Sequence, residues 1–227
     1  MAADTPATAT ASLSAEVPHP GTLSPKQQSR LERHIDGLID AAKLEGEASE
    51  EKARQIMADH FPRLWAWHEV HDAELAALWG QWSEARSTPN KDEAKAAGFT
   101  DQIAEVYKSF QPQHDRFVKQ LSEELTSEQV DAVKDRLTRS PGMMRTYNAY
   151  CAVIPEMTEE QKAYVLENFK KAREEGMDTS ASKEVADIFK KYKILNEAYI
   201  NEQGYDWAAR YKAHFYPPKP ADKKPGG

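Results

Sequence analysis

The chain has 227 residues and a formal net charge of −7, and 40% of its residues are hydrophobic. This length suits one buried core, and the acidic balance, with lysine and arginine interleaved among acids, argues against a nucleic-acid partner. A single cysteine, Cys151, excludes an intrachain disulfide and a thiolate metal cluster. We expect no membrane span and see no signal peptide in residues 1–22, which lack a basic start and an apolar core.

Helical periodicity begins soon after this opening segment. Ser24-Pro25 is a cap followed by proline at the first helical position, and the apolar spacing continues up to Gly46. A second helix begins at Ser49 and is interrupted or bent at Pro62, because proline lacks an amide proton and crowds the preceding turn. A third helix is expected over residues 63–86.

The middle of the chain carries another long helical pattern. It covers residues 92–125, with bends expected at Gly98 and Pro112. Capping boxes at residues 126–129 and 158–161 then predict the starts of two further helices.

The last third combines one irregular stretch with two helices. Residues 138–155 show no clear helical period and are expected to form a long connection, of the kind that often carries function. Helices are expected over 182–203 and, briefly, over 206–215. No run of alternating apolar and polar residues is long enough to form a strand.

These patterns predict an all-α fold. We expect one domain over residues 24–215, an antiparallel array of about seven or eight helices. The N-terminal arm 1–23 and the tail 216–227 are expected to be disordered.

An aromatic and cationic group of residues is the main candidate site. Sugars are bound by flat aromatic faces with polar groups beside them, and acidic sugars also require Arg or Lys. The same residue types also tie helices together in ordinary cores, which keeps a structural role open. The candidate binding residues are Arg145, Asn148, Arg173, Lys191, Tyr192, Lys193 and Asn196.

Two catalytic mechanisms fit the same region. Glycoside hydrolysis needs two carboxylates, for which Glu174 and Asp178 are the candidates, although Asp135, Asp206 and Glu197 are also eligible. Elimination from a uronic acid needs a base, for which Tyr147 or Tyr150 is the candidate. No spacing rule selects a hydrolase, a lyase or a binding protein. Motifs for a serine nucleophile or a phosphate-binding loop are absent.

Three histidines are weak metal candidates. His68 and His71 are spaced i, i+3 on one helix, and His114 lies on a later apolar stripe. Because histidines on aromatic-rich stripes usually hydrogen-bond within a core, we expect neither a metal nor another cofactor.

Several motifs in the C-terminal half resemble a known family. They are Leu125-Thr-Ser-Glu-Gln-Val-Asp-Ala-Val-Lys-Asp135, Thr146-Tyr-Asn-Ala-Tyr150, Met157-Thr-Glu-Glu-Gln-Lys162, Ala172-Arg-Glu-Glu-Gly-Met-Asp178, Lys191-Tyr-Lys-Ile-Leu-Asn196 and Gln203-Gly-Tyr-Asp206. The chain resembles domain of unknown function 3826, a family for which sugar binding is proposed; the likeness is strongest over residues 114–206 and looser over the preceding helices. The resemblance implies a periplasmic or secreted helical protein, encoded among polysaccharide-degrading enzymes, with a carbohydrate as its partner. The oligomeric state stays open, with a homodimer as one option. The usual Arg-Ile pair of the family is replaced here by Ile194-Leu195.

Two other classes remain open. The paired Leu/Met-Thr-x-x-Gln motifs at residues 125–129 and 157–161 also resemble those of periplasmic helical chaperones and metal-stress sensors. Alternatively, the chain is a structural helical module without a small-molecule site. Exposed aromatic side chains around residues 145–150 would argue against that module, and full burial would favour it.

Overall fold

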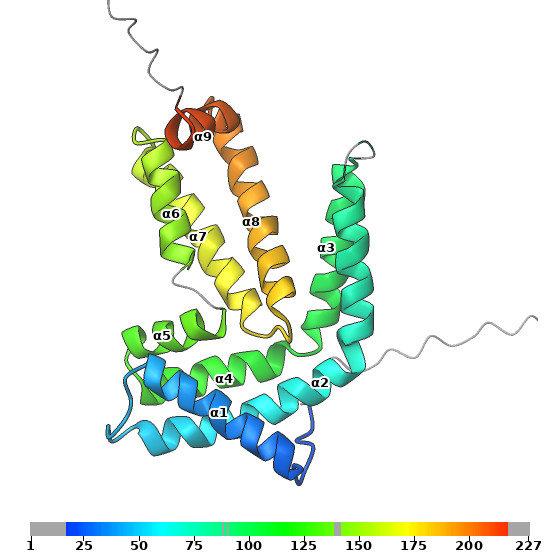
Figure 1. Ribbon diagram of the computed structural model, residues 1–227, viewed down its shortest axis with the longest axis vertical. Coiled ribbons are helices and arrows are strands. Elements are labelled where there is room, and N and C mark those ends of the chain that lie inside the picture. The colour runs from blue at the N-terminus through cyan, green and yellow to red at the C-terminus, as the bar shows by residue number, and fades with distance from the viewer. Residues whose placement is uncertain (1–16, 88, 90, 139–141, 218–227) are drawn as a thin grey trace, which may run out of the picture. The chain divides into compact units, whose positions relative to one another are not determined.

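The computed structural model describes residues 17–87, 89, 91–138 and 142–217. Within these ranges it contains nine α-helices and no strand, which confirms the all-α prediction (Figure 1). Residues 1–16 and 218–227, which make up most of the predicted disordered arm and tail, lie outside the described residues. Among the described residues, no helix combines the length and the apolar composition that a membrane span requires.

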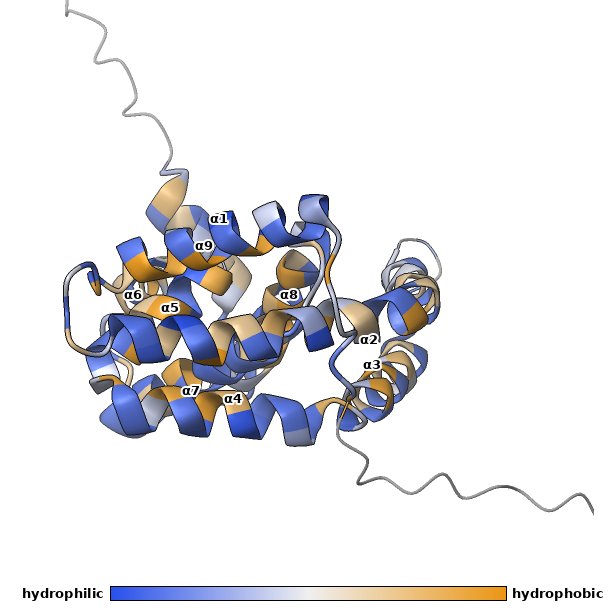
Figure 2. Ribbon diagram, turned by 90° about the horizontal axis from the view of Figure 1, so that it is seen from below, coloured by the Kyte–Doolittle hydropathy of each residue, from blue (hydrophilic) through white to orange (hydrophobic). Residues whose placement is uncertain are grey.

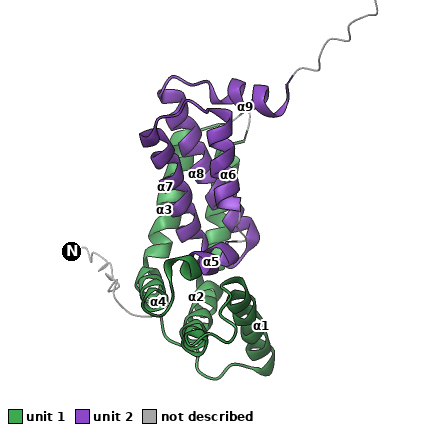
Figure 3. Cartoon of the chain, turned by 90° about the vertical axis from the view of Figure 1, so that its left-hand side faces the viewer, with its two compact units in different colours: residues 1–130 green, residues 131–227 purple. Residues whose placement is uncertain are grey.

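The contacts divide the chain into two compact units, coloured green and purple in Figure 3. Unit 1 is Met1–Val130 and unit 2 is Asp131–Gly227, so the boundary falls inside helix α5 (Ser127–Leu137). The expected extent of one domain over 24–215 stays a prediction.

Unit 1 is built from α1 (Pro25–Ala41), α2 (Glu50–Ala85), α3 (Glu93–Lys108) and α4 (Gln111–Glu124). The predicted cap at Ser24 is present, because its side chain accepts a hydrogen bond from the amide of Gln27. The helices are amphipathic, and α1 carries hydrophilic residues on one side and hydrophobic residues on the other (Figure 2).

Two boundaries in unit 1 differ from the sequence prediction. The helices expected on either side of Pro62 are one 36-residue helix, α2, which changes direction along its length (Figure 1). Pro62 is buried in it beside Phe61, so apolar packing compensates for the missing backbone hydrogen bond. The single helix expected over 92–125 is two helices, α3 and α4, because Pro112 occupies the first turn of α4, where no amide is needed.

Unit 2 contains α6 (Gly142–Val153), α7 (Glu159–Gly176), α8 (Ser182–Glu202) and α9 (Trp207–Phe215). The prediction of a long irregular connection over 138–155 is wrong for its larger part, which forms α6. Met143, Tyr150 and Val153 of α6 are buried, at spacings of seven and three that place them on one face. The residues of the prediction at 139–141 lie outside the described ranges.

The core of unit 2 joins all four of its helices. Tyr150 of α6, Phe169 of α7, Ile200 of α8 and Trp207 of α9 belong to one buried cluster. α7 and α8 run side by side as an antiparallel hairpin, and α9 lies across the ends of α6 and α8 (Figure 1). This arrangement brings residues 145–150 next to residues 193–215.

Candidate functional site

A groove with a volume of about 670 Å³ lies among α6, α8 and α9. All its lining residues belong to unit 2. The wall combines aromatic rings, small residues and charged side chains; the lining residues are Arg145, Thr146, Ala149, Tyr150, Lys193, Glu197, Trp207, Ala208, Tyr211 and Phe215.

Helix α9 supplies the aromatic wall. The side chain of Asp206 caps this helix by accepting a hydrogen bond from the amide of Ala209 at 2.9 Å. The next residue, Trp207, is followed by Tyr211 and Phe215 at intervals of four, which places the three rings on one helical face. Tyr211 and Phe215 are 40% and 43% exposed, so their rings are accessible in the groove.

Tyr150 forms the buried base of the groove. Its ring stacks on Trp207, with centroids 4.1 Å apart and planes 23° apart. Its hydroxyl donates to the backbone oxygen of Lys193 at 3.3 Å and approaches Glu197 Oε1 at 3.5 Å. These hydrogen bonds join α6 to α8 beside the charged residues of the groove.

Both candidate tyrosine bases have environments that favour the protonated phenol. Burial, and then the nearby Glu197 carboxylate, raise the pKa of Tyr150 far above its usual value. Burial, together with a hydrogen bond to Cys151, raises the pKa of the half-buried Tyr147 to about 12. A phenol with a raised pKa is a poor general base near neutral pH.

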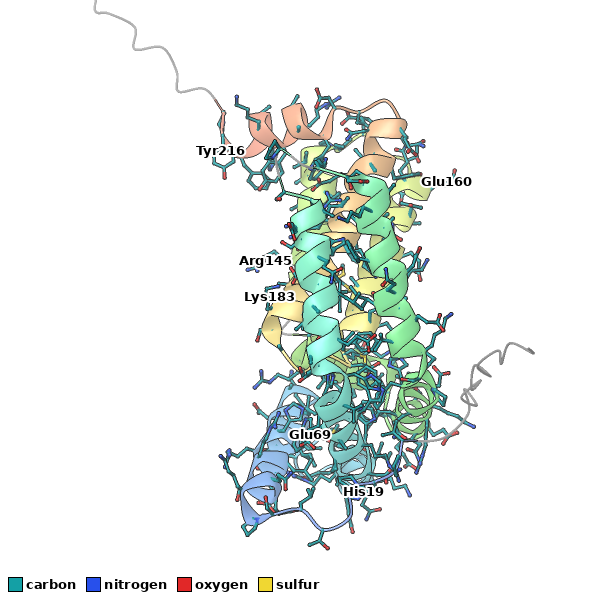
Figure 4. All side chains as sticks on the ribbon, turned by 90° about the vertical axis from the view of Figure 1, so that its right-hand side faces the viewer. His19, Glu69, Arg145, Glu160, Lys183 and Tyr216 are labelled. Carbon is teal, nitrogen blue, oxygen red and sulfur yellow. The ribbon has the colours of Figure 1, made fainter. Side chains whose placement is uncertain are left out.

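The groove also holds two cations from different helices. Arg145 of α6 is exposed and projects away from the ribbon (Figure 4), whereas Lys193 of α8 is half-buried. Within the described part of the chain, neither side chain forms an ion pair or a hydrogen bond. With Glu197, the described lining therefore carries two positive charges and one negative charge.

Other predicted site residues form structural ion pairs between α5 and α7. Arg173 is buried and pairs with Asp131 Oδ1 at 2.5 Å and with Asp135 Oδ1 at 2.9 Å. Glu174 accepts two hydrogen bonds from Lys134 Nζ, each of 2.7 Å. These charges hold helices together within unit 2, away from the lining of the groove.

A second structural group joins α7 to α8. The hydroxyl of Tyr192 donates to Glu175, and Lys191 Nζ pairs with the same carboxylate at 2.5 Å. Burial, and then Glu175, raise the pKa of Tyr192 well above its usual value. Asn196 is fully buried; it accepts from Asn168 Nδ2 at 2.8 Å and donates to the backbone of α7 at 3.3 Å.

The three remaining candidates lie apart from the groove lining. Tyr147 of α6 packs against the core of unit 2, Asn148 is exposed on the same helix, and Asp178 is buried just after the end of α7. Of the eleven predicted catalytic and binding residues, the structure thus brings Arg145, Tyr150 and Lys193 into one groove.

The histidine candidates occupy unit 1. His68 is buried and its Nδ1 lies 2.6 Å from Asp72 Oδ1, whereas the partly exposed His71 packs against Trp67 at 4.5 Å between centroids. His114 is buried on α4. Across the described ranges, no three histidine, cysteine or acidic side chains come together as a metal site.

The sequence interpretation missed the aromatic wall. Trp207, Tyr211 and Phe215 were assigned only to a short final helix, although their i, i+4, i+8 spacing after the Asp206 cap was visible. Such a stripe also occurs on buried helix faces, so spacing alone does not show that two of the rings are exposed.

No curated protein matches this chain, whereas one family model matches most of its length. The model of the family described as "Protein of unknown function (DUF3826)" matches residues 29–218, so the region of likeness extends well before residue 114. The chain belongs to the family DUF3826.

Proposed function

We propose that this chain is a carbohydrate-binding protein whose site is the groove among α6, α8 and α9. The observation that carries the proposal is the pair of accessible rings, Tyr211 and Phe215, on the wall that also holds Arg145 and Lys193. The proposed ligand is an oligosaccharide.

The chemistry of a sugar ring matches both parts of this wall. The apolar C–H face of a pyranose packs on an aromatic ring, while its hydroxyl groups need hydrogen-bonding partners at the edge. Tyr211 and Phe215 have centroids 4.7 Å apart, and together they offer a broader apolar surface than one ring. Arg145, Lys193 and Glu197 supply donors and an acceptor beside it.

The groove favours binding over turnover. Glycoside hydrolysis requires two carboxylates across the bond, whereas Glu197 is the one carboxylate in the described lining. Elimination requires a base, and the phenol of Tyr150 is held protonated. We propose a periplasmic or secreted location, for which the sequence resemblance is the support.

Replacement of the exposed rings tests the proposal. Removing either aromatic surface from a buried contact costs about 1.5–3 kcal/mol, so Tyr211→Ala and Phe215→Ala should each weaken oligosaccharide binding about tenfold or more. The measurement is calorimetric titration of the purified full chain with a panel of neutral and acidic oligosaccharides. Mass analysis of the same mixtures would reveal a hydrolysed or unsaturated product.

A matched control is Tyr164→Ala. Tyr164 is an exposed aromatic residue of unit 2, 41% accessible, which stacks on Tyr199 outside the groove. Its replacement should leave binding unchanged. Equal losses in all three variants would place the site elsewhere, and no binding to any member of the panel would exclude the proposed function.

A further inference from the structure

Several cations of unit 2 outside the groove are neutralised by neighbouring acids. Lys134 pairs with Glu174 at 2.7 Å, and Lys162 pairs with Glu159 at the same distance. Arg145 and Lys193, by contrast, have no ion-pair partner in the described residues. This occurs in a chain whose net charge is −7, where acidic partners are abundant.

Lys193 remains unpaired although an acid lies one helical turn away. Glu197 follows it by four residues on α8, which is a favourable spacing for an ion pair. Yet the described structure contains no Lys193–Glu197 ion pair, and Glu197 Oε1 lies 3.5 Å from the hydroxyl of Tyr150. The ammonium group of Lys193 is therefore available to a ligand in the groove.

The fold holds the two cations on separate helices of the same groove. The hydrogen bond from the Tyr150 hydroxyl to the backbone oxygen of Lys193 fixes α6 against α8 at this point. Arg145 lies five residues before Tyr150 on α6, and both residues line the groove. A planar carboxylate suits the fork of a guanidinium, and an ammonium adds a second point charge.

We propose that the groove selects a saccharide bearing a carboxylate, a uronate, with Arg145 and Lys193 binding the carboxylate while Tyr211 and Phe215 contact the sugar ring. This inference rests on the proposed carbohydrate binding and adds the chemical class of the ligand. The unpaired cations supply the charge preference, and the aromatic wall distinguishes a sugar from a free anion.

The test uses pairs of sugars that differ only in charge. The full chain is titrated with oligogalacturonate and oligoglucuronate, and with the same oligosaccharides after reduction of each carboxyl to a primary alcohol. Because a hydrogen bond to a charged group is stronger than one to a neutral group, a uronate should bind at least about tenfold more tightly than its reduced form. Added salt should weaken the uronate complex and leave the reduced-sugar complex nearly unchanged.

Charge-neutral variants identify the residues responsible. Arg145→Gln and Lys193→Gln should each lower the affinity for the uronate about tenfold and that for the reduced sugar by much less, because glutamine keeps a donor for a sugar hydroxyl but carries no charge. Lys171→Gln is the control, since Lys171 is an exposed cation of α7 outside the groove. Circular dichroism checks that helix content is the same in all three variants.

The outcomes separate the two proposals. Equal affinity for a uronate and its reduced form would overturn the charge preference while supporting carbohydrate binding. A uronate preference that survives both glutamine variants would assign the carboxylate to other residues and overturn the inference. No binding of either form would overturn the uronate preference, and no binding of any sugar in the full panel would overturn both proposals.

Discussion

Asn196 and Asn168 form a polar pair inside unit 2. Asn196 is completely buried, and the amide groups of the two side chains are joined by a hydrogen bond of 2.8 Å. A second hydrogen bond, of 3.3 Å, ties Asn196 to the backbone oxygen of Val165. Loss of one partner would leave buried polar atoms without compensation.

We therefore expect Asn196→Ala to lower the free energy of unfolding by about 1–3 kcal/mol, measured by urea denaturation. Asn148→Ala is the control, because Asn148 is exposed on α6 and should show a change near zero. Similar effects of the two substitutions would mean that the buried pair is not a significant source of stability.

His60 gives unit 1 a pH dependence. Its ring lies parallel to Phe117, with centroids 3.8 Å apart, and only 2% of the residue is exposed. Burial, and then repulsion from His114, lower the pKa of His60 to about 3, whereas an exposed histidine titrates near 6.5. Between these values the unfolded chain binds more protons, so stability present above pH 6.5 is lost as the pH falls toward 3.

The melting temperature should consequently decrease across this range, and His60→Phe should make the decrease shallower. Phenylalanine retains the stacked shape without a group that can be protonated. The measurement is thermal unfolding followed by circular dichroism at several pH values. The control is His214→Gln, at an exposed position of α9, which should keep the wild-type dependence of melting temperature on pH. If His60→Phe also keeps that dependence, His60 is not its source.

For single residues, the sequence indicates which side chains could bind a ligand better than it indicates which groups they contact in the fold. Arg145, Tyr150 and Lys193 were selected as candidates and do share a groove. Arg173 was selected for the same chemical reason, but its charge is neutralised by two aspartates of α5. That pairing depends on how α5 and α7 pack, which residue type and local spacing do not specify.

Helix starts are the elements that the sequence defines most clearly. Thr158 was identified as the cap of α7, and its side chain accepts from the amide of Gln161 at 3.2 Å while Gln161 Oε1 accepts from the amide of Thr158 at 3.0 Å. Helix α6 was missed because polar residues interrupt its buried face. A capping box is a local interaction that the sequence shows directly. The buried face of α6, by contrast, is determined by the helices that pack against it.

The capping interaction can be measured at one helix and compared with another. Thr158→Ala should lower the free energy of unfolding by about 1 kcal/mol, because the amide of Gln161 loses its acceptor. Ser49→Ala is the matched control, since Ser49 occupies the cap position of α2 without a side-chain hydrogen bond to the helix. Denaturant unfolding of both variants is the assay, and an equal loss would contradict the capping role.

At the scale of the whole molecule, helix α5 is the segment of the chain that connects the two units. Residues Ser127–Val130 of α5 belong to unit 1 and Asp131–Leu137 belong to unit 2. Val130 and Val133 are both buried, on either side of the boundary. Because helix formation is cooperative, loss of one part of α5 is expected to weaken the other.

We expect one thermal transition, with equal calorimetric and van't Hoff enthalpies. Phe117→Ala in unit 1 and Phe169→Ala in unit 2 should each cost about 3–5 kcal/mol and lower the temperature of that same transition. Both side chains are fully buried. Two separate transitions, each affected by one substitution, would show instead that the units unfold independently.

The stacking of Trp207 on Tyr150 also makes the groove observable by spectroscopy. Of the five tryptophans, Trp207 alone follows residue 130, and the other four are in α2. In protein labelled with fluorotryptophan, a ligand that enters the groove should shift one fluorine resonance, which disappears in Trp207→Phe. The chain thus carries its own reporter, able to register weak ligands whose heat of binding is too small to measure.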